Sequence, residues 1–233
     1  MLKFEQVGVG SAMIHEAPFR AVEFEAGKGD LLVVVVRRAG VAEALADLAL
    51  GLREPGGGRV LWQGRDWREM MPEEAEAERG RIGRVFEGWG WVSNLDVEEN
   101  LKLAAHHHTR RDDDDLDREL TGWFRRFGVN EIPASRPAFT ERRLLMIAQW
   151  VRAFVGQPAF LLLEHPERNA RDEELDLLAE AVREARGRGC GILWFTNDIR
   201  VWQNRAFNPS AVWRREGERL VEVGKETHGG KAV

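Results

Sequence analysis

The sequence predicts an α/β fold built around a mostly parallel sheet. Residues 31–36 (LLVVVV) are aliphatic on both faces, which is typical of a strand buried on both sides in a parallel sheet. Residues 160–163 and 191–195 form two more short apolar runs, and helical patterns separate the three. Loose alternation over the first 25 residues, closed by Gly27 and Gly29, predicts antiparallel strands before the first buried strand.

Periodicity and turn residues predict the remaining elements. An apolar face at Val41, Ala44, Leu45 and Leu48 predicts a helix that ends before Gly51. Further helices are expected at 73–81, 142–155 and 173–188, and further strands at 59–62 and 82–86. Residues 94–133 are charged and helical in pattern, so we expect an all-helical insert there.

Length and composition predict a soluble globular protein with one large domain or two small ones. The chain has 233 residues, 43% of them hydrophobic, and a formal net charge of −5. We expect a core over about 1–93 and 157–224, a helical subdomain over about 94–156, and a frayed tail over 225–233. No stretch is long and apolar enough to span a bilayer, a single cysteine fits a reducing cytosol, and the acidic charge argues against nucleic-acid binding.

Several fixed-spacing motifs together resemble one family. They are PGGGRVLWQGRD at 55–66, RIGRVF at 81–86, NLDVEENL at 94–101, and VRAFVGQPAFLLLEHP at 151–166. In this order they resemble the nucleotide-binding (ATPase) subunit of an ABC transporter, from about residue 2 to residue 224. The resemblance implies a P-loop NTPase fold with a helical subdomain, and ATP and Mg²⁺ as cofactors. The 94–100 stretch is similar to subunits of MCE-type lipid-transport systems.

The phosphate-binding loop of that family is degenerate in this chain. Residues 36–44 read VRRAGVAEA, so Ala42 stands at the position of the family's lysine and Glu43 at that of its Mg²⁺-holding hydroxyl. Arg37 and Arg38 are the cations left in the loop. We therefore expect neither ATP nor Mg²⁺ to be retained as a cofactor.

The other chemical positions of the family are altered as well. Glu87 replaces the glutamine after the 82–86 strand, and Glu164-His165 stand where the family carries Asp-Glu. Asn197 replaces the switch histidine. The signature segment reads TERRL at 140–144 and the dimer-contact loop reads RNAR at 168–171. We therefore expect no catalytic residue and no nucleotide-binding residue, with these positions vestigial.

Other features have a functional and a structural interpretation. The tract His106–His108 suggests a metal site, but adjacent histidines point apart, so we favour a solvated loop without metal. His165 is interpreted as a hydrogen-bonded structural residue rather than a base. Trp89 and Trp91 lie where the family receives its permease, and either dock there or pack against the helical subdomain. The arginine pairs at 125–126 and 142–143 are expected in salt bridges, and Cys190 is expected to be inert.

The prediction for function is a degenerate ABC transporter ATP-binding-type subunit, acting as a structural or regulatory partner of a membrane permease. It would sit in the cytoplasm, peripheral on the inner face of the cell membrane, with a second such subunit or a copy of itself as a further partner. Two alternatives remain. One is an ATPase with a rearranged site that uses Arg37, Arg38 and Glu164, and the other is a free-standing soluble adaptor.

Overall fold

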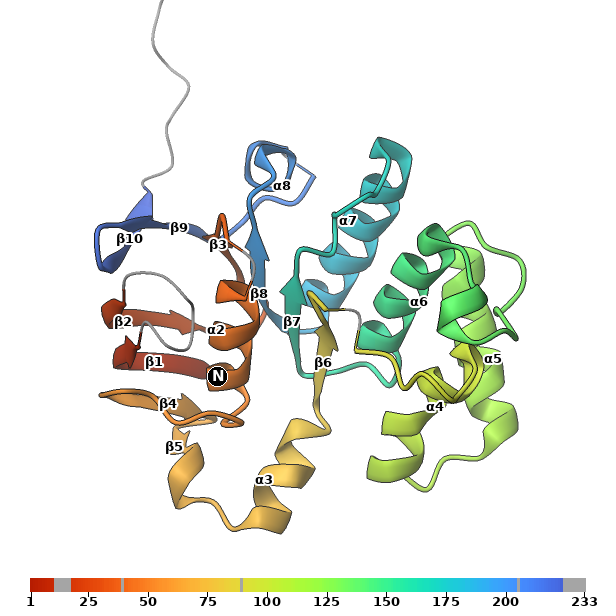
Figure 1. The fold of residues 1–233 in the computed structure, drawn as a ribbon, viewed down its shortest axis with the longest axis horizontal. Coiled ribbons are helices and arrows are strands. Elements are labelled where there is room, and N and C mark those ends of the chain that lie inside the picture. Colours follow the sequence, from red (N-terminus) through yellow and green to blue (C-terminus); the bar gives the residue numbers. More distant parts are fainter. Residues whose placement is uncertain (11–17, 39, 89, 205, 224–233) are drawn as a thin grey trace, which may run out of the picture.

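The molecule contains two sheets, with a cluster of helices on one side of them (Figure 1). This computed structural model describes residues 1–10, 18–38, 40–88, 90–204 and 206–223. The strands are β1 Leu2–Val9, β2 Phe19–Ala26, β3 Leu31–Val35, β4 Arg59–Trp62, β5 Arg65–Asp66, β6 Ile82–Val85, β7 Phe160–Glu164, β8 Gly191–Thr196, β9 Ala211–Glu216 and β10 Arg219–Val223. The helices are α2 Val41–Ala49, α3 Pro72–Arg79, α4 Val97–His108, α5 Asp113–Arg126, α6 Arg142–Phe154, α7 Asp172–Gly187 and α8 Ile199–Gln203. The expected tail at 225–233 lies outside the described residues.

The larger sheet confirms the expected mostly parallel topology. Its strand order is β10-β9-β3-β8-β7-β6, and only the β10–β9 pair is antiparallel. The smaller sheet, β2-β1-β4-β5, is antiparallel throughout and contains the predicted N-terminal strands.

Strand β3 separates two apolar cores, as its two-sided aliphatic pattern predicts. Leu32 and Val34 pack in one core together with α2 and the antiparallel sheet. Leu31 and Val33 pack in the other core, against residues of α4, α5, α6 and α7. Because β3, β6, β7 and β8 run parallel, the loops that follow them meet at one edge of the sheet. That edge is where side chains from distant parts of the sequence can form a site.

The motif at 94–100 has a structural explanation. Asp96 caps α4 by accepting from the Glu99 amide at 2.8 Å, while the Glu99 carboxylate accepts from the Asp96 amide at 2.9 Å. Asn100 is buried, and its amide group bonds both the N–H and the carbonyl of Val92, at 2.8 and 3.0 Å. The motif therefore holds the segment after β6 against the start of α4.

The histidine tract is helical, so the expected loop is wrong. His106–His108 form the last turn of α4, where basic residues are favoured by the helix dipole. His106 and His107 are exposed and contact Asp113 and Glu76. Over the described part of the chain, no group of three or more His, Cys, Asp or Glu side chains is arranged to hold a metal ion. Within the same residues, no helix has the length and apolar character needed to cross a membrane.

Candidate functional site

The loop after β3 and the first turn of α2 form the centre of the candidate site. Arg37 and Arg38 are exposed. Gly40 caps α2 with a φ of 81°, and it alone has a positive φ among the described residues between β3 and α2. Glu43 is exposed in the first turn of α2.

Ala42 is part of the apolar core. Its exposed fraction is 0%, and it belongs to the cluster that also contains Val34 and Leu45. A side chain here is directed into packed aliphatic groups rather than into solvent. The position that the resemblance assigns to a phosphate-binding lysine therefore contributes to packing.

A carboxylate of the protein itself occupies the N-terminal end of α2. Glu87, which follows β6, accepts a hydrogen bond from the Gly40 amide at 3.0 Å. Helix N-terminal amides are favoured binding positions for anions such as phosphate. Glu87 is 9% exposed and also accepts from the Arg168 guanidinium at 3.1 Å. An internal negative charge is thus held where the resemblance would place a phosphate.

Glu164, at the end of β7, is held in a buried ion pair. Its Oε1 accepts from Arg84 Nε at 2.5 Å, and its Oε2 accepts from the Glu87 amide at 3.0 Å. The side chains of Arg84 and Glu164 are 7% and 1% exposed. Arg84 also donates to Asp47 Oδ1 on α2 at 2.8 Å. One guanidinium therefore ties β6 to both β7 and α2.

The electrostatics of Glu164 follow from this burial. Desolvation raises the pKa of the Glu164 carboxyl above its usual value, and the adjacent Arg84 charge opposes that shift. The ion pair therefore keeps a carboxylate in a place that would otherwise favour the neutral acid. If Arg84 were removed, the free-energy cost of burying the Glu164 charge would no longer be offset.

His165 is buried but does not form the expected side-chain hydrogen bond. Its φ is 48°, and its backbone N–H donates to the Phe195 carbonyl at 2.9 Å. Nδ1 lies 3.7 Å from Glu167 Oε1, Nε2 lies 4.0 Å from Glu87 Oε1, and among the described residues Nδ1 has no hydrogen-bond partner. The cavity among Glu87, Glu164 and His165 has a volume of about 30 Å³, the space of a single water molecule.

The remaining predicted positions do not converge on this centre. Asn197 is exposed after β8. Arg143, in the segment that aligns with the signature, pairs with the buried Glu174 of α7. Trp91 is half-buried against the helical core, with the Arg152 guanidinium 4.4 Å from its ring, and Trp89 lies outside the described residues. Trp91 packs as its structural interpretation predicts, and a docking role for the pair stays a prediction.

The salt-bridge expectation is confirmed for one member of each arginine pair. Arg126 pairs with Glu184, so one member of each arginine pair, Arg126 and Arg143, lies in a salt bridge. Burial raises the pKa of the Cys190 thiol to about 12, which makes it unreactive as a nucleophile at neutral pH.

Sequence reasoning missed Arg84, Asp47 and Glu167. Glu167 is 2% exposed and accepts from the Trp194 indole N–H at 3.0 Å and from the Thr196 hydroxyl. The pairing of β6 with β7 could have indicated the Arg84–Glu164 contact. Arg84 is opposite Leu162, and Glu164, two residues after Leu162, lies on the same face of the sheet. That inference requires knowing that β6 and β7 are neighbours.

Comparisons with known proteins agree with this architecture. No family model matches the sequence. Among curated proteins, the ribose import ATP-binding protein RbsA 2 of Streptomyces coelicolor is 25% identical over 77% of this chain. The cell division ATP-binding protein FtsE of Escherichia coli K12 is 22% identical over 89% of this chain and 92% of its own length. The chain spans only 35% of the length of RbsA 2.

Among solved structures, the dimeric bacterial ABC transporter cassette MJ0796 superposes with a TM-score of 0.81. It is 16% identical, and the match covers 94% of this chain and 96% of that one. The fold is therefore that of an ABC cassette, as the framework motifs predicted.

Proposed function

We propose that this chain, a homologue of ABC transporter ATP-binding subunits with the cassette fold, has lost ATP binding and hydrolysis and serves as a structural or regulatory partner of a membrane permease. The observation that carries the proposal is the contact of Glu87 with the Gly40 amide at the start of α2. The N-terminal amide that would meet a phosphate already has an anionic partner.

The balance of charges opposes a bound polyphosphate. Charge-assisted contacts to phosphate contribute about 1.5–3 kcal/mol each, and a micromolar affinity corresponds to about 8 kcal/mol. Ala42 supplies no cation, while the carboxylates of Glu43 and Glu87 add negative charge beside the same helix terminus. Arg37 and Arg38 remain as exposed cations, which contribute less than a lysine held over the phosphates.

The groups needed for hydrolysis are committed to internal contacts. Glu164 would have to leave Arg84 and the Glu87 amide before it could hold Mg²⁺. His165 stands where the resemblance places a carboxylate base, between Glu87 and Glu167. These contacts favour the degenerate subunit over a rearranged ATPase that uses Arg37, Arg38 and Glu164.

Pairing with another subunit would not repair the site. In the family that this chain resembles, one subunit's phosphate loop faces the signature segment of another. Here the loop has Ala42 and the signature-like segment is TERRL, in which Arg143 is paired with Glu174. Neither half that this chain would contribute is intact, whether its partner is a copy of itself or a second cassette.

Equilibrium titration with fluorescent ATP and Mg²⁺ tests the loss of nucleotide binding. We expect no saturation at the loop after β3 below about 1 mM, since the loop lacks most of the contacts that sum to micromolar affinity. The ATP-binding protein FtsE, titrated in the same buffer, is the positive control. A dissociation constant in the low micromolar range that is weakened in Arg37→Ala would contradict the proposal.

Membrane association tests the proposed permease partner. In cells that contain the native neighbours of this chain, we expect it to sediment with membranes at the cytoplasmic face and to be released when Trp89 and Trp91 are both replaced by serine. Trp123→Ser is a matched control, because that tryptophan lies on α5, where its ring packs on Phe127 and Phe154. Unchanged sedimentation of the folded double variant would argue against docking through these residues, and a wild-type chain found wholly in the soluble fraction would favour a free-standing adaptor.

A further inference from the structure

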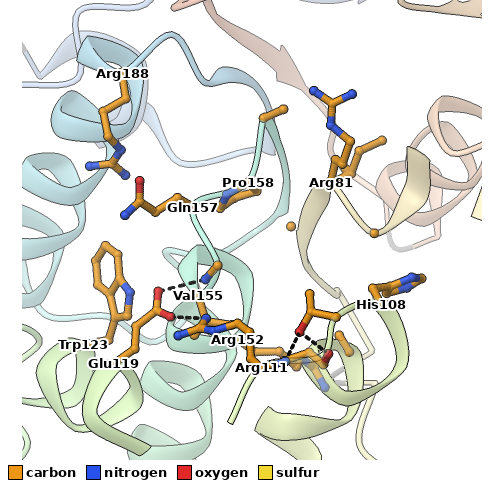
Figure 2. Close-up of a pocket in the computed structure, with 18 of the residues that line it drawn as sticks. Arg81, His108, Arg111, Glu119, Trp123, Arg152, Val155, Gln157, Pro158 and Arg188 are labelled. Carbon is orange, nitrogen blue, oxygen red and sulfur yellow. Dashed lines mark hydrogen bonds and ion pairs between the residues drawn. The ribbon is translucent and has the colours of Figure 1, made fainter. Parts of the chain in front are cut away.

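A second cavity lies at the opposite edge of the parallel sheet from the candidate site. Its volume is about 1110 Å³, and it is bordered by the start of β6, the turn between α6 and β7, and the ends of α4 and α7, with α5 as a further wall. None of the degenerate nucleotide positions lines it. Figure 2 shows Arg188 and Trp123 on one side of this cavity and Arg81 and His108 on the other.

The lining is strongly basic in an acidic protein. Two glutamates face five cationic side chains, so the lining carries an excess of positive charge although the whole chain carries −5. The cations are Arg81, Arg111, Arg126, Arg152 and Arg188. A recess lined by side chains of one charge sign raises the local concentration of ions of the opposite charge.

Three glutamates neutralise part of this charge: Glu119 and Glu184 in the lining, and Glu78 beside it, which accepts from Arg81 at 3.2 and 3.3 Å. Glu184 is shared between Arg126 and Arg188, and the latter contact is 2.5 Å. Glu119 accepts from Arg111 at 2.5 Å and from the Gly156 amide at 2.9 Å. Each carboxylate therefore holds cationic side chains in place at the wall, and the Arg126–Glu184–Arg188 cluster keeps a net positive charge.

Arg152 forms part of the wall from α6. It donates to the Gly90 carbonyl at 2.8 Å and to the Gln149 amide oxygen at 3.1 Å. Its guanidinium also lies over the rings of Phe86 and Trp91, at 5.1 and 4.4 Å from their centres. Burial and the nearby Arg84 charge lower the pKa of Arg152 to about 10, so it stays charged at neutral pH. Burial and the neighbouring His107 lower the pKa of His108, which contributes a neutral ring.

The cavity also has open space next to α5. A Cβ built on Gly122 meets no atom within 4 Å, and this residue lines the cavity from within the helix. The space is larger than a single phosphate needs, and basic side chains lie on both sides of it. Two linked anionic groups on one ligand would pair with basic side chains on both sides at once.

We propose that this cavity binds a small polyanion with linked phosphate groups, either an inorganic polyphosphate or the phosphate chain of a nucleotide. The arginines supply bidentate donors that match phosphate oxygens. The site is separate from the loop after β3, so the proposal does not depend on the loss of ATP binding there.

Calorimetric titration with inorganic tripolyphosphate tests the proposal. At about 50 mM salt we expect saturable binding of one ligand per chain, weakened at least tenfold at about 200 mM salt because the attraction is electrostatic. Gly122→Glu adds a carboxylate to open space and should weaken binding at least tenfold, and Arg188→Gln should also weaken it. Gly122→Ala, with no added charge, and Arg37→Ala, at the other edge of the sheet, should keep it within about twofold.

A competition experiment with ADP distinguishes a nucleotide from an inorganic polyphosphate. If ADP competes with tripolyphosphate, and if ADP binding is lost in Gly122→Glu, the ligand is a nucleotide. If tripolyphosphate binds and ADP does not compete with it, the ligand is an inorganic polyphosphate. ATP binding at this cavity would likewise be abolished by Gly122→Glu and unaffected by Arg37→Ala. This pair of variants distinguishes ATP bound in the cavity from ATP bound at the loop after β3. No saturable binding of tripolyphosphate, or binding that Gly122→Glu leaves unchanged in a folded protein, would overturn the proposal.

Discussion

Replacing Arg84 by methionine is expected to lower the free energy of unfolding by about 3–5 kcal/mol at pH 8. The variant leaves the Glu164 carboxylate, 1% exposed, without its cationic partner. Asp47 loses the same partner but keeps Arg53 at 2.8 Å, so the cost arises at Glu164. In a chain of this size the change corresponds to a melting temperature lower by about 6–20 °C, measurable by circular dichroism.

The destabilisation of Arg84→Met should depend on pH. Without the guanidinium, burial is the largest remaining influence on Glu164 and the Glu87 N–H opposes it only in part, so the folded-state pKa rises further above the unfolded value of about 4.3. A carboxyl with a raised folded-state pKa contributes its stability below the unfolded pKa and loses it as the pH rises through the folded pKa. The variant should therefore be closer to the wild type at pH 5.5 than at pH 8, by at least about 1 kcal/mol.

Two further variants separate the buried ion pair from general damage. Arg84→Met combined with Glu164→Gln should recover at least half of the lost stability and lose the added pH dependence, because the amide oxygen can still accept from the Glu87 N–H. Arg65→Met breaks an exposed pair with Glu74 and should cost less than about 1 kcal/mol. A single Arg84→Met variant as stable as Arg65→Met would show that the buried pair does not hold β6, β7 and α2 together.

The elements that could be predicted are those set by local pattern. The two-sided aliphatic run at 31–36 identifies β3, and the parallel sheet follows from its repetition in β7 and β8. Helix boundaries differ from the expected ones by one residue in α6 and α7, which is the normal uncertainty of helix ends. The histidine tract was misjudged because it continues α4 without a glycine or proline to end the helix, and basic residues are favoured at that terminus.

The site was predictable in composition but not in its contacts. The sequence shows that the lysine position is Ala42 and that Glu87 replaces a glutamine. It does not show that Glu87 reaches the Gly40 amide, 47 positions earlier, or that Arg84 meets Glu164, 80 positions later. Those contacts depend on which strands are neighbours and on their register, which only the assembled sheet defines.

Introducing the missing lysine is expected to damage the fold rather than restore nucleotide binding. Ala42→Lys places a long charged side chain at a position with an exposed fraction of 0%, in the core shared by β3 and α2. Overpacking of a well-packed core costs about 1–3 kcal/mol, and desolvation of the ammonium adds to it. We expect the free energy of unfolding to fall by about 3 kcal/mol or more in urea titrations, with no gain in affinity for ATP and Mg²⁺.

The neighbouring position provides the matched control. Glu43→Lys adds the same side chain one residue later, on the exposed face of α2, and should change stability by no more than about 0.5 kcal/mol. The difference between the two variants therefore measures how completely the lysine position has become part of the core. If Ala42→Lys were as stable as Glu43→Lys and bound ATP at micromolar concentrations, the lysine would have found an open phosphate site, and the loss of that site in this chain would be a single reversible step.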